Sequence, residues 1–393
     1  MLPLLTWDLY ANPIGVPSTP WERNLSRLNV TEATFGTIAD GGFGQATLSF
    51  DKVSLGLMEE ALNDWKMKRV VVSDSAGNIP YEGFIAEINA TYGHHVYTWS
   101  IDPFFNRAIV VYDSTVKGAT VSKREFVNET DIDATYSSQT SLGIKEEWLD
   151  YPFGVTIATQ ANAYGKQRMK RVLKPLMSSL HLGTGSAMAE NNLTLTIMGA
   201  YGTLLWRKTT AKATSATEIA TLLATGLTSG TYAQYLTTSD LTQLATTGRS
   251  VTYNTDSSPI WLQDWIHGLL TGGDNAGRRL FFQVAAGRIP VLYSRRTAPV
   301  YFSQGKDWRV LNADRGVIPA YMVAAGGYVQ ADDLTDNLDE PSDVIGRVRA
   351  SLIEQTQYDA LTDSLDIDPP ADLTDTRRLL GRYARQSRKR ALG

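Results

Sequence analysis

The sequence of 393 residues contains no cysteine, only four histidines and 20% charged residues. Without cysteine the chain has no disulfide, no thiolate metal site and no cysteine nucleophile. This composition also favours a protein that folds without an oxidising compartment. The formal net charge is −4 at pH 7, so the chain as a whole lacks the basic footprint of a nucleic-acid-binding protein.

Long apolar runs are absent as well. No stretch reaches the roughly 18 apolar residues of a membrane span. The first ten residues, MLPLLTWDLY, carry no basic region and include Asp8, so we expect no signal peptide. The composition is instead rich in threonine, alanine, glycine and aromatic residues, which favours strands and turns. With 43% hydrophobic residues the chain can build real cores, and its length predicts two to four domains.

Residues 1–115 predict a mostly β domain. Between residues 97 and 101, tyrosine, tryptophan and isoleucine alternate with Thr98 and Ser100, which is the period of a strand. The segment Asp74–Asn78 is rich in residues that tolerate left-handed backbone and predicts a turn. A short helix is expected at Leu55–Trp65. Together these patterns predict an antiparallel meander with short turns.

Residues 116–206 predict an extension followed by a second β region. Residues 116–150 are polar and charged and are expected to form a loop or extension. The strand Leu193–Met198 is expected to turn at Gly199–Gly202 into another strand, Thr203–Trp206. This order repeats the strand, corner and strand of residues 97–112, which suggests two related β units.

Residues 207–297 predict a small α+β domain. Ser215–Glu218 is a capping-box pattern that opens a helix from Ile219, with Gly226 as its stop. A second helix is expected to start at Ser258-Pro259 and to end at Gly272-Gly273. Its apolar face consists of Trp261, Leu262, Trp265, Ile266 and Leu269. A hairpin follows, with its strands at residues 280–284 and 289–293.

The last part of the chain shows two changes of composition. Residues 298–345 predict short β segments and a linker, since residues 332–343 contain six acids and no base. Residues 346–393 predict a helical segment, with the helix at Arg347–Leu365, followed by a basic tail. The last 17 residues carry seven bases and no acid: Arg377, Arg378, Arg382, Arg385, Arg388, Lys389 and Arg390.

The segment SIDPFFNRAIVVY, residues 100–112, is the first candidate for an active site. It places Asp102, Asn106 and Arg107 between two strand-like runs, just after two histidines. A hydrolase triad needs a histidine to relay the proton, but none of the four lies in a nucleophile elbow or a zinc-binding helix motif. We therefore interpret these four as structural or surface residues: His94, His95, His181 and His267.

Carboxylates offer a second chemical interpretation. Asp102, Glu82 and Glu87 could supply a pair of acids for glycosidic cleavage. The alternative for Asp102-Pro103, which we prefer, is turn initiation. Asn106 and Arg107 would then fasten the corner, with Arg107 pairing a carboxylate or capping carbonyls. Residues 183–185 resemble half of a dinucleotide loop but lack the βαβ context, so we expect a turn.

The charged segments near the C-terminus have two interpretations each. The acidic run has carboxylates at a spacing that suits calcium, but it lacks the glycine and terminal glutamate of a calcium loop. A solvated linker is the preferred interpretation. The basic tail is either a short docking helix or a solvated terminus. We predict no catalytic residue, no cofactor site, no metal site and no enzymatic activity.

Three features in order resemble the tail proteins of long-tailed bacteriophages, in particular the baseplate or tail-tip hub family. The first is a run of strands and the corner that follows them, the second is the start of an inserted domain, and the third is a helix, a glycine turn and a hairpin. They span roughly residues 80–295. The segments are Tyr81–Ile88, Tyr97–Ile101 and Asn106–Tyr112, then Ser215–Ala220, then Pro259–Ile266, Leu270–Arg279, Leu280–Val284 and Arg288–Tyr293.

The resemblance implies a structural virion protein rather than an enzyme. Its fold would be a β-rich, multidomain α+β fold, with antiparallel tube-type barrel or sandwich domains and an inserted α+β domain; the helical C-terminal segment is predicted from the residues alone. It would assemble in the host cytoplasm as a homo-oligomer, with a trimer favoured and a hexamer possible. Its partners would be other tail proteins, namely tube or distal tail, tape measure, and tail-tip or fibre proteins. DNA would pass the lumen without specific binding, since the walls are not basic.

Two other functions stay open at this point. Exposed tryptophan and tyrosine side chains are typical of carbohydrate-binding and receptor-binding proteins, and the chain has 9 tryptophans and 18 tyrosines. Their alternating or helical spacing instead indicates a core or a subunit interface. The second alternative is a glycan hydrolase with Asp102 or Glu82 as the acid. The acidic run and the basic tail do not belong to the family pattern.

Overall fold

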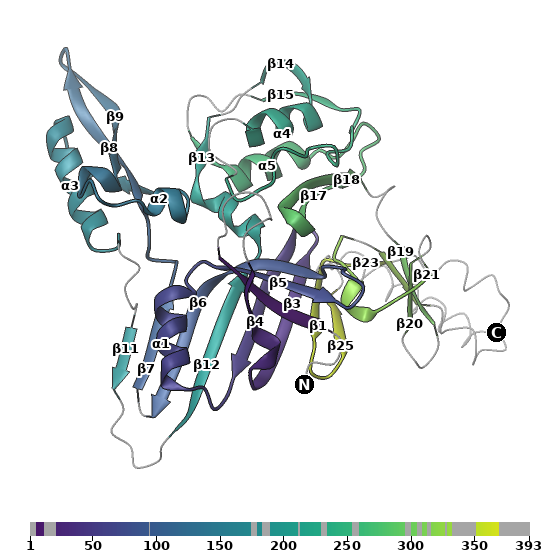
Figure 1. Ribbon diagram of the computed structural model, residues 1–393. Helices are drawn as coiled ribbons and strands as arrows, with labels where there is room; N and C mark the ends of the chain where they lie inside the picture. Colours follow the sequence, from purple (N-terminus) through teal and green to yellow (C-terminus); the bar gives the residue numbers. More distant parts are fainter. Residues whose placement is uncertain are drawn as a thin grey trace, which may run out of the picture.

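The computed structural model shows a β-rich chain in which several antiparallel sheets are joined by short helices (Figure 1). Among the described residues, no helix is long and apolar enough to cross a membrane. The described residues are 5–11, 21–93, 95–173, 179–182, 189–210, 213–228, 234–253, 259–294, 300–304, 309–312, 316–326, 328–331 and 351–368.

The main sheet has 13 strands, nine of which follow one another in the order β2-β1-β5-β6-β12-β4-β3-β24-β25. Most of its pairs are antiparallel, as the sequence predicts. The two ends of this path, β2 and β25, are not paired with each other, and none of the sheets in the described part closes into a barrel. The strands of this path are β1 (Leu5–Tyr10), β2 (Trp21–Asn24), β3 (Val30–Ile38), β4 (Gly41–Phe50), β5 (Arg69–Asp74), β6 (Tyr81–Gly93), β12 (Ala189–Met198), β24 (Gln355–Asp359) and β25 (Ser364–Asp368).

Four more strands belong to this sheet but lie off this path. The strand β7 (His95–Ser100) pairs with β6 and with β11 (Ser179–Leu182), while β17 (Leu280–Ala285) joins β4 in parallel and pairs with β18 (Ile289–Ser294). The strand β12 lies between β6 and β4, so the expected second β region is part of the first sheet. The run Thr203–Trp206, predicted as a strand, belongs to the 3-10 helix η3 (Ala200–Trp206).

The core of this sheet is built on aromatic side chains. Trp7, Trp65 and Trp99 are fully buried, and the ring of Phe35 contacts Trp7, Tyr81 and Tyr358. The helix α1 (Leu55–Asp64), predicted at this place, begins where the Ser54 hydroxyl accepts from the Leu57 amide at 3.3 Å. The same core continues into the helices α4 and α5, which are described below.

A separate lobe projects from the main sheet (Figure 1). Its sheet has the order β10-β8-β9, and one face is covered by α3 over a second core. In α3, Gly165 allows a close approach, since a Cβ there would lie 2.8 Å from Val110 and 2.9 Å from Val127. The elements are β8 (Arg107–Val116), β9 (Ala119–Asn128), η2 (Glu129–Asp131), α2 (Ser138–Ser141), β10 (Glu146–Asp150) and α3 (Ala158–Lys170).

This lobe corrects the prediction for residues 116–150. They are an extension, but much of it is regular structure rather than loop. The strand β9 pairs with β8 over ten residue pairs, and its first six residues are exposed on both faces, since neither face is covered at this end of the hairpin. A polar exposed strand does not show the apolar alternation from which strands are predicted.

The α+β unit follows the predicted order with shifted ends. The helix α4 (Ile219–Thr228) starts where predicted, but the predicted capping box Ser215–Glu218 lies in a strand, and it is Glu218 whose carboxylate accepts from the Thr221 amide of the first turn. The helix continues through Gly226, whose missing Cβ makes room for the Trp265 ring. The helix α5 (Leu262–Leu270) starts later than predicted, because residues 260–261 form a short strand. The small strands are β13 (Lys208–Thr209), β14 (Ala213–Glu218), β15 (Ser250–Tyr253) and β16 (Ile260–Trp261). The predicted hairpin at residues 280–293 is confirmed by β17 and β18, which are joined by η4 (Ala286–Arg288).

The helix predicted at Arg347–Leu365 is wrong in its described part, which starts at residue 351. The strands β24 and β25 form a hairpin, and β24 pairs with β3 of the main sheet. Thr356 and Tyr358 are buried while Gln355 and Gln357 are exposed, so the pattern has the period of a strand. The acidic run and the basic tail lie outside the described residues.

A small five-stranded sheet precedes this hairpin. Its order is β21-β20-β19-β22-β23. Four of these strands agree with the short β segments that the sequence predicts for residues 298–330, and the fifth, β23, lies further along the chain. A 3-10 helix, η5 (Ala320–Met322), lies between two of its strands, as η1 (Leu25–Arg27) does in the main sheet between β2 and β3. The strands are β19 (Val300–Gln304), β20 (Arg309–Asn312), β21 (Gly316–Ile318), β22 (Tyr328–Ala331) and β23 (Ser351–Leu352).

Candidate functional site

The segment between β7 and β8 is a tight corner between the main sheet and the lobe. The chain turns at Asp102-Pro103, where both residues are exposed and the Asp102 amide donates to the Ser100 hydroxyl at 3.2 Å. Phe104 packs in the core of the main sheet and Phe105 in the core of the lobe. The corner therefore fixes one structural part against the other, in agreement with the interpretation of Asp102-Pro103 as a turn.

Asn106 is the most constrained polar residue of this corner. It is completely buried, and its amide nitrogen donates to the Gly143 carbonyl at 2.8 Å and to the Ser138 hydroxyl at 3.0 Å. Its amide oxygen accepts from the Lys145 backbone N–H at 2.9 Å. Its backbone carbonyl accepts from the Glu129 amide and the Gln139 side chain. The residue ties the segment 129–145 to the start of β8 and leaves no polar group for a substrate.

A buried carboxylate near this corner forms ion pairs with two arginines. Glu146 lies on β10, and its side chain is almost fully buried. Arg207 donates to it at 3.1 Å, and Arg107 lies 3.5 Å away. The three residues come from β10, from the end of η3 and from β8, so the ion pairs join segments that are distant in the sequence. Arg107 pairs with a carboxylate as predicted, but it does not cap the carbonyls of the corner.

Lys145 performs that capping instead. Its ammonium donates at 2.8 Å to the carbonyls of Ile101 and of Asp102 and lies 5.6 Å from the centre of the Trp206 ring. Burial lowers the pKa of Lys145 to about 8, although the nearby carboxylates of Asp102 and Glu147 act in the opposite direction. The corner thus holds a cation whose charge is sensitive to pH above neutrality.

We expect Lys145 to make stability depend on alkaline pH. A lysine of the unfolded chain titrates near pH 10.5, so between about pH 8 and 10.5 the unfolded chain binds more protons than the folded one. The free energy of unfolding should therefore rise with pH in this window, by about 1–3 kcal/mol relative to Lys145→Gln. Urea unfolding of both proteins from pH 7 to pH 10.5 measures the difference, and a difference that stays constant would contradict the expectation.

A second cationic contact joins the lobe to the α+β unit. The Lys208 ammonium lies 4.3 Å from the ring centre of Trp148, on β10, and 4.8 Å from that of Trp261, on β16. Burial lowers the pKa of Lys208, while Asp150 acts in the opposite direction. Both contacts lie within the distance at which a cation is attracted to an aromatic face. This lysine was not singled out from the sequence, because nothing in the sequence places Trp148 beside Trp261.

Glu82, one of the candidate acids, lies in another buried ion cluster. Its carboxylate is paired with Arg69 at 2.7 Å and with Arg288 at 3.7 Å, and it accepts from the Gly287 amide at 2.7 Å. Burial lowers the pKa of Arg288, against the effect of Glu82. A cavity of only about 10 Å³ adjoins this cluster, which is the size of one water molecule. Glu82 therefore binds the β17–β18 hairpin to β5 and β6.

Glu82 and Glu87 do not form a catalytic pair. They are five residues apart on β6, which separates their backbones by about 16 Å in an extended strand. Glycosidase carboxylates are about 5–10 Å apart. Glu87 accepts at 2.5 Å from the Asn89 side chain, which in turn accepts from Thr98 on the neighbouring strand. The side chain of Glu87 thus belongs to a hydrogen-bond chain on the surface of the sheet.

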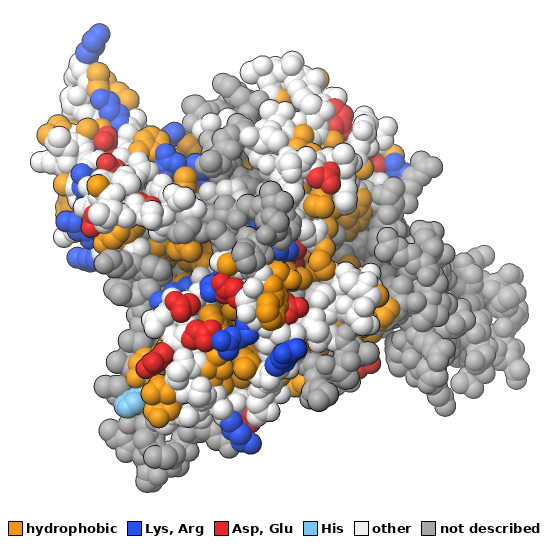
Figure 2. All heavy atoms as spheres, in the orientation of Figure 1, with side chains coloured by type: hydrophobic (Ala, Val, Ile, Leu, Met, Phe, Trp, Pro, Cys, Tyr) orange, Lys and Arg blue, Asp and Glu red, His pale blue; other side chains and the backbone are white. Residues whose placement is uncertain are grey.

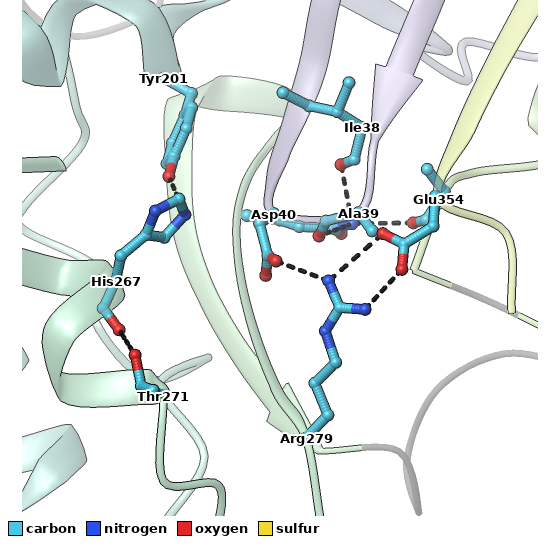
Figure 3. Close-up of polar contacts among 10 residues, drawn as sticks. Ile38, Ala39, Asp40, Tyr201, His267, Thr271, Arg279 and Glu354 are labelled. Atoms are coloured by element: carbon cyan, nitrogen blue, oxygen red, sulfur yellow. Dashed lines mark hydrogen bonds and ion pairs between the residues drawn. The ribbon is translucent and has the colours of Figure 1, made fainter. Parts of the chain in front are cut away.

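A third polar junction centres on Arg279 (Figure 3). Its guanidinium donates to Asp40 at 2.8 Å and to both carboxylate oxygens of Glu354, at 2.5 and 3.2 Å. The Ala39 amide donates to the Glu354 carbonyl at 2.8 Å. Arg279 directly precedes β17, and on that strand Gln283 donates to the carbonyls of Ala39 and Ala325. The turn between β3 and β4 is thereby held to β17 and to the start of β24.

The two histidine side chains that the structure describes, those of His95 and His267, lie on different elements. His267 is exposed on α5, and its ring nitrogen lies 3.1 Å from the Tyr201 hydroxyl (Figure 3). Burial, with a smaller effect of Asp40, raises the pKa of Tyr201. His95 is half-buried on β7, at the far end of that strand from the corner. His94 and the side chain of His181 lie outside the described residues, as does the segment 183–185.

A hollow of about 270 Å³ lies between the α+β unit and the β17–β18 hairpin. Thr247, Asn275 and Tyr293 are among its lining residues. Asp274 also lines it, but its carboxylate accepts from the backbone amides of Ala276 and Arg278 and from the Arg278 side chain. Hydrogen bonds from Arg278, first of all its backbone N–H, hold the pKa of Asp274 below its usual range. The carboxylate of Asp274 is thus ionised, and its oxygens already accept hydrogen bonds from the chain itself.

The described residues contain no group of three or more histidines and acids that could hold a metal ion. No model of a known protein family matches this sequence. No curated protein matches it either. The interpretation of the polar residues therefore depends on the geometry of this structure. In that geometry, buried ion pairs connect segments that are distant in the sequence.

Proposed function

We propose that this chain is a structural protein of a phage tail, of the baseplate or tail-tip hub type. It would assemble into a homo-oligomeric ring that continues the tail tube and anchors tail-tip proteins. The observation that carries the proposal is that buried polar residues connect distant segments of the chain. Asn106, Glu146 and Glu82 are all buried in contacts that hold segments of a β framework together, which suits a part that bears load in an assembly.

Two further features support a ring. The main sheet is open, and within the described residues its outer strands β2 and β25 each have one partner strand only. Such edges present unpaired backbone groups with which strands of a neighbouring copy can pair. A net charge of −4 also suits a lumen through which DNA passes, since it offers no overall attraction for phosphates. A trimer is the favoured state and a hexamer the alternative.

The virion location and the partners follow from the same proposal. The segments that resemble hub proteins lie in β6, β7, the corner and β8, in β14 and the start of α4, and in the α5–hairpin unit. These elements form the framework of the ring in the proposal. Tube or distal tail proteins, the tape measure and tail-tip or fibre proteins would bind to it. The tube-like domain arrangement would be completed by neighbouring copies, because one chain does not close a barrel in its described part.

The mass of the purified chain in solution tests this function. We expect a particle of three or six times 43.2 kDa, with a central opening in negative-stain images. A chain that stays monomeric at all concentrations and is missing from purified virions would contradict the proposal. Trp21 is 55% exposed, so glycan binding that is lost in Trp21→Ala would favour the carbohydrate-binding alternative. Turnover of a glycan that is lost in Asp102→Asn would favour a hydrolase.

A further inference from the structure

The outer end of the lobe exposes large apolar side chains. It consists of the β8–β9 turn, residues 114–123, and of the loop between β10 and α3, residues 151–160; we call it the lobe tip. The second segment is held beside the start of the first, since the Thr156 amide donates at 2.8 Å to the carbonyl of Asp113, which directly precedes residue 114. The exposed fractions are 74% for Phe153, 59% for Ile157, 55% for Val155, 43% for Val121 and 37% for Val116.

Val116 and Val121 lie on one face of the lobe sheet. Side chains alternate along a strand, so Val116 on β8 lies on the face of Tyr112, and Val121 is placed on the same face of β9 by its pairing with Ser114. This is the face that α3 covers over the second core. The loop with Phe153 leads directly into α3. The apolar side chains thus lie beyond the first turn of this helix, where it leaves the sheet uncovered.

The tip has a rigid base. Lys117 and Gly118 have φ values of 51° and 84°, as in the two-residue turns that join hairpin strands. The Phe153 ring packs edge-on against Tyr151, which packs against Tyr164 of α3. A hydrogen bond between the side chains of Thr156 and Gln160 fastens the first turn of the helix. The exposure of the apolar groups is therefore a feature of a folded surface.

The charge of the tip has one sign. The 20 residues of its two segments contain two lysines, both exposed, and no acid. The lysines are Lys117 and Lys123. Asp113 and Asp150 lie at the inner boundary of the tip, together with Arg124. The rest of the chain carries a net charge of −6, since the whole chain has −4 and the tip has +2. Figure 2 shows blue and orange side chains at this end of the lobe.

We infer that the lobe tip binds the surface of a bilayer that contains anionic lipids. Its apolar side chains would enter the boundary between headgroups and acyl chains, and the lysines would contact lipid phosphates. A convex end with phenylalanine, valine and isoleucine beside lysine suits this surface. Protein interfaces are enriched in phenylalanine too, but they are depleted in lysine, and both charged residues of the tip are lysines. The inference does not depend on ring formation, and the two are tested by different measurements.

Flotation of the full chain with lipid vesicles tests this inference. We expect it to float with vesicles of phosphatidylglycerol and phosphatidylcholine in equal parts, and much less with phosphatidylcholine alone or in high salt. The double variant Phe153→Ser/Ile157→Ser should bind at least about tenfold more weakly, because two large apolar groups no longer enter the lipid. The double variant Leu55→Ser/Leu361→Ser is the matched control. It changes side chains that are 46% and 40% exposed outside the lobe and should bind like wild type.

The lysines provide an independent variant in case the serine substitutions affect folding. Lys117→Glu/Lys123→Glu should abolish the preference for anionic vesicles. The inference is overturned if the wild-type chain does not float with anionic vesicles, or if both tip variants float as well as wild type. It is also overturned if the chain does not float and the tip variants lower its mass in solution, since the tip is then a contact between proteins.

Discussion

Replacing Glu82 by glutamine is expected to lower the free energy of unfolding by about 3–5 kcal/mol, the largest effect among the polar residues of this chain. The carboxylate is 2% exposed and faces two buried arginines, Arg69 and Arg288. Glutamine has nearly the same shape, so the backbone of β6 is undisturbed. It removes a carboxylate that is paired with both of these buried cations, and the loss of one partner of a buried ion pair is strongly destabilising.

Urea unfolding of Glu82→Gln beside Glu22→Gln gives the comparison. Glu22 lies 2.5 Å from Lys68, but its side chain is 30% exposed, so its loss should cost less than about 1 kcal/mol. Equal losses in the two variants would contradict the structural role of Glu82. So would a Glu82→Gln protein that keeps wild-type stability and loses the cleavage of a glycan, because Glu82 would then be a catalytic acid.

The alternation of apolar residues was sufficient to predict much of the sheet. Residues 97–101 and the hairpin at 280–293 have the period of strands, and both are strands in the structure. The sequence did not indicate where β12 lies. It pairs between β6 and β4, more than 90 residues away along the chain, and such pairings depend on which apolar faces meet in the core. The strands themselves can be predicted from local sequence patterns. Their order in the sheet depends on contacts between distant segments.

The C-terminal error has a similar cause. Residues 351–368 contain many residues with a neutral preference, so the local sequence does not distinguish a strand from the predicted helix. In the structure the buried Thr356 hydroxyl lies 2.7 Å from the Thr37 hydroxyl of β3, and the Tyr358 ring packs against Phe35. These contacts with the N-terminal strands decide for a strand. Tertiary packing thus overrides a weak local preference.

The candidate site was predicted in part. The turn at Asp102-Pro103 and the fastening role of Asn106 followed from residue types whose side chains bond nearby backbone. Glu146 and Arg207 were missed, because a charged residue in a polar segment gives no sign of burial. Glu82 gave a usable signal. It is a single acid between Tyr81 and the apolar run that follows, and an acid in such a strand needs a buried partner.

Asn106→Ala is the second substitution with a large expected effect, a loss of about 3 kcal/mol in the free energy of unfolding. Alanine removes three side-chain hydrogen bonds, to Gly143, Ser138 and Lys145. The Gly143 carbonyl and the Lys145 amide then remain buried without these partners, which costs more than the hydrogen bonds themselves contribute. Because these partners belong to the segment that joins α2 to β10, the lobe should loosen first.

Hydrogen exchange resolves that order. Amides of β8 and β10 should exchange faster in Asn106→Ala than in wild type, while those of β3 and β4 in the main sheet should change less. Asn275→Ala, which truncates an exposed amide of the α+β unit, should change stability by less than about 0.5 kcal/mol. If Asn106→Ala behaved like Asn275→Ala, the corner would not be the fastening between sheet and lobe. A faster exchange confined to the lobe would show that the lobe is a separate cooperative unit and that Asn106 is one of the residues that hold it.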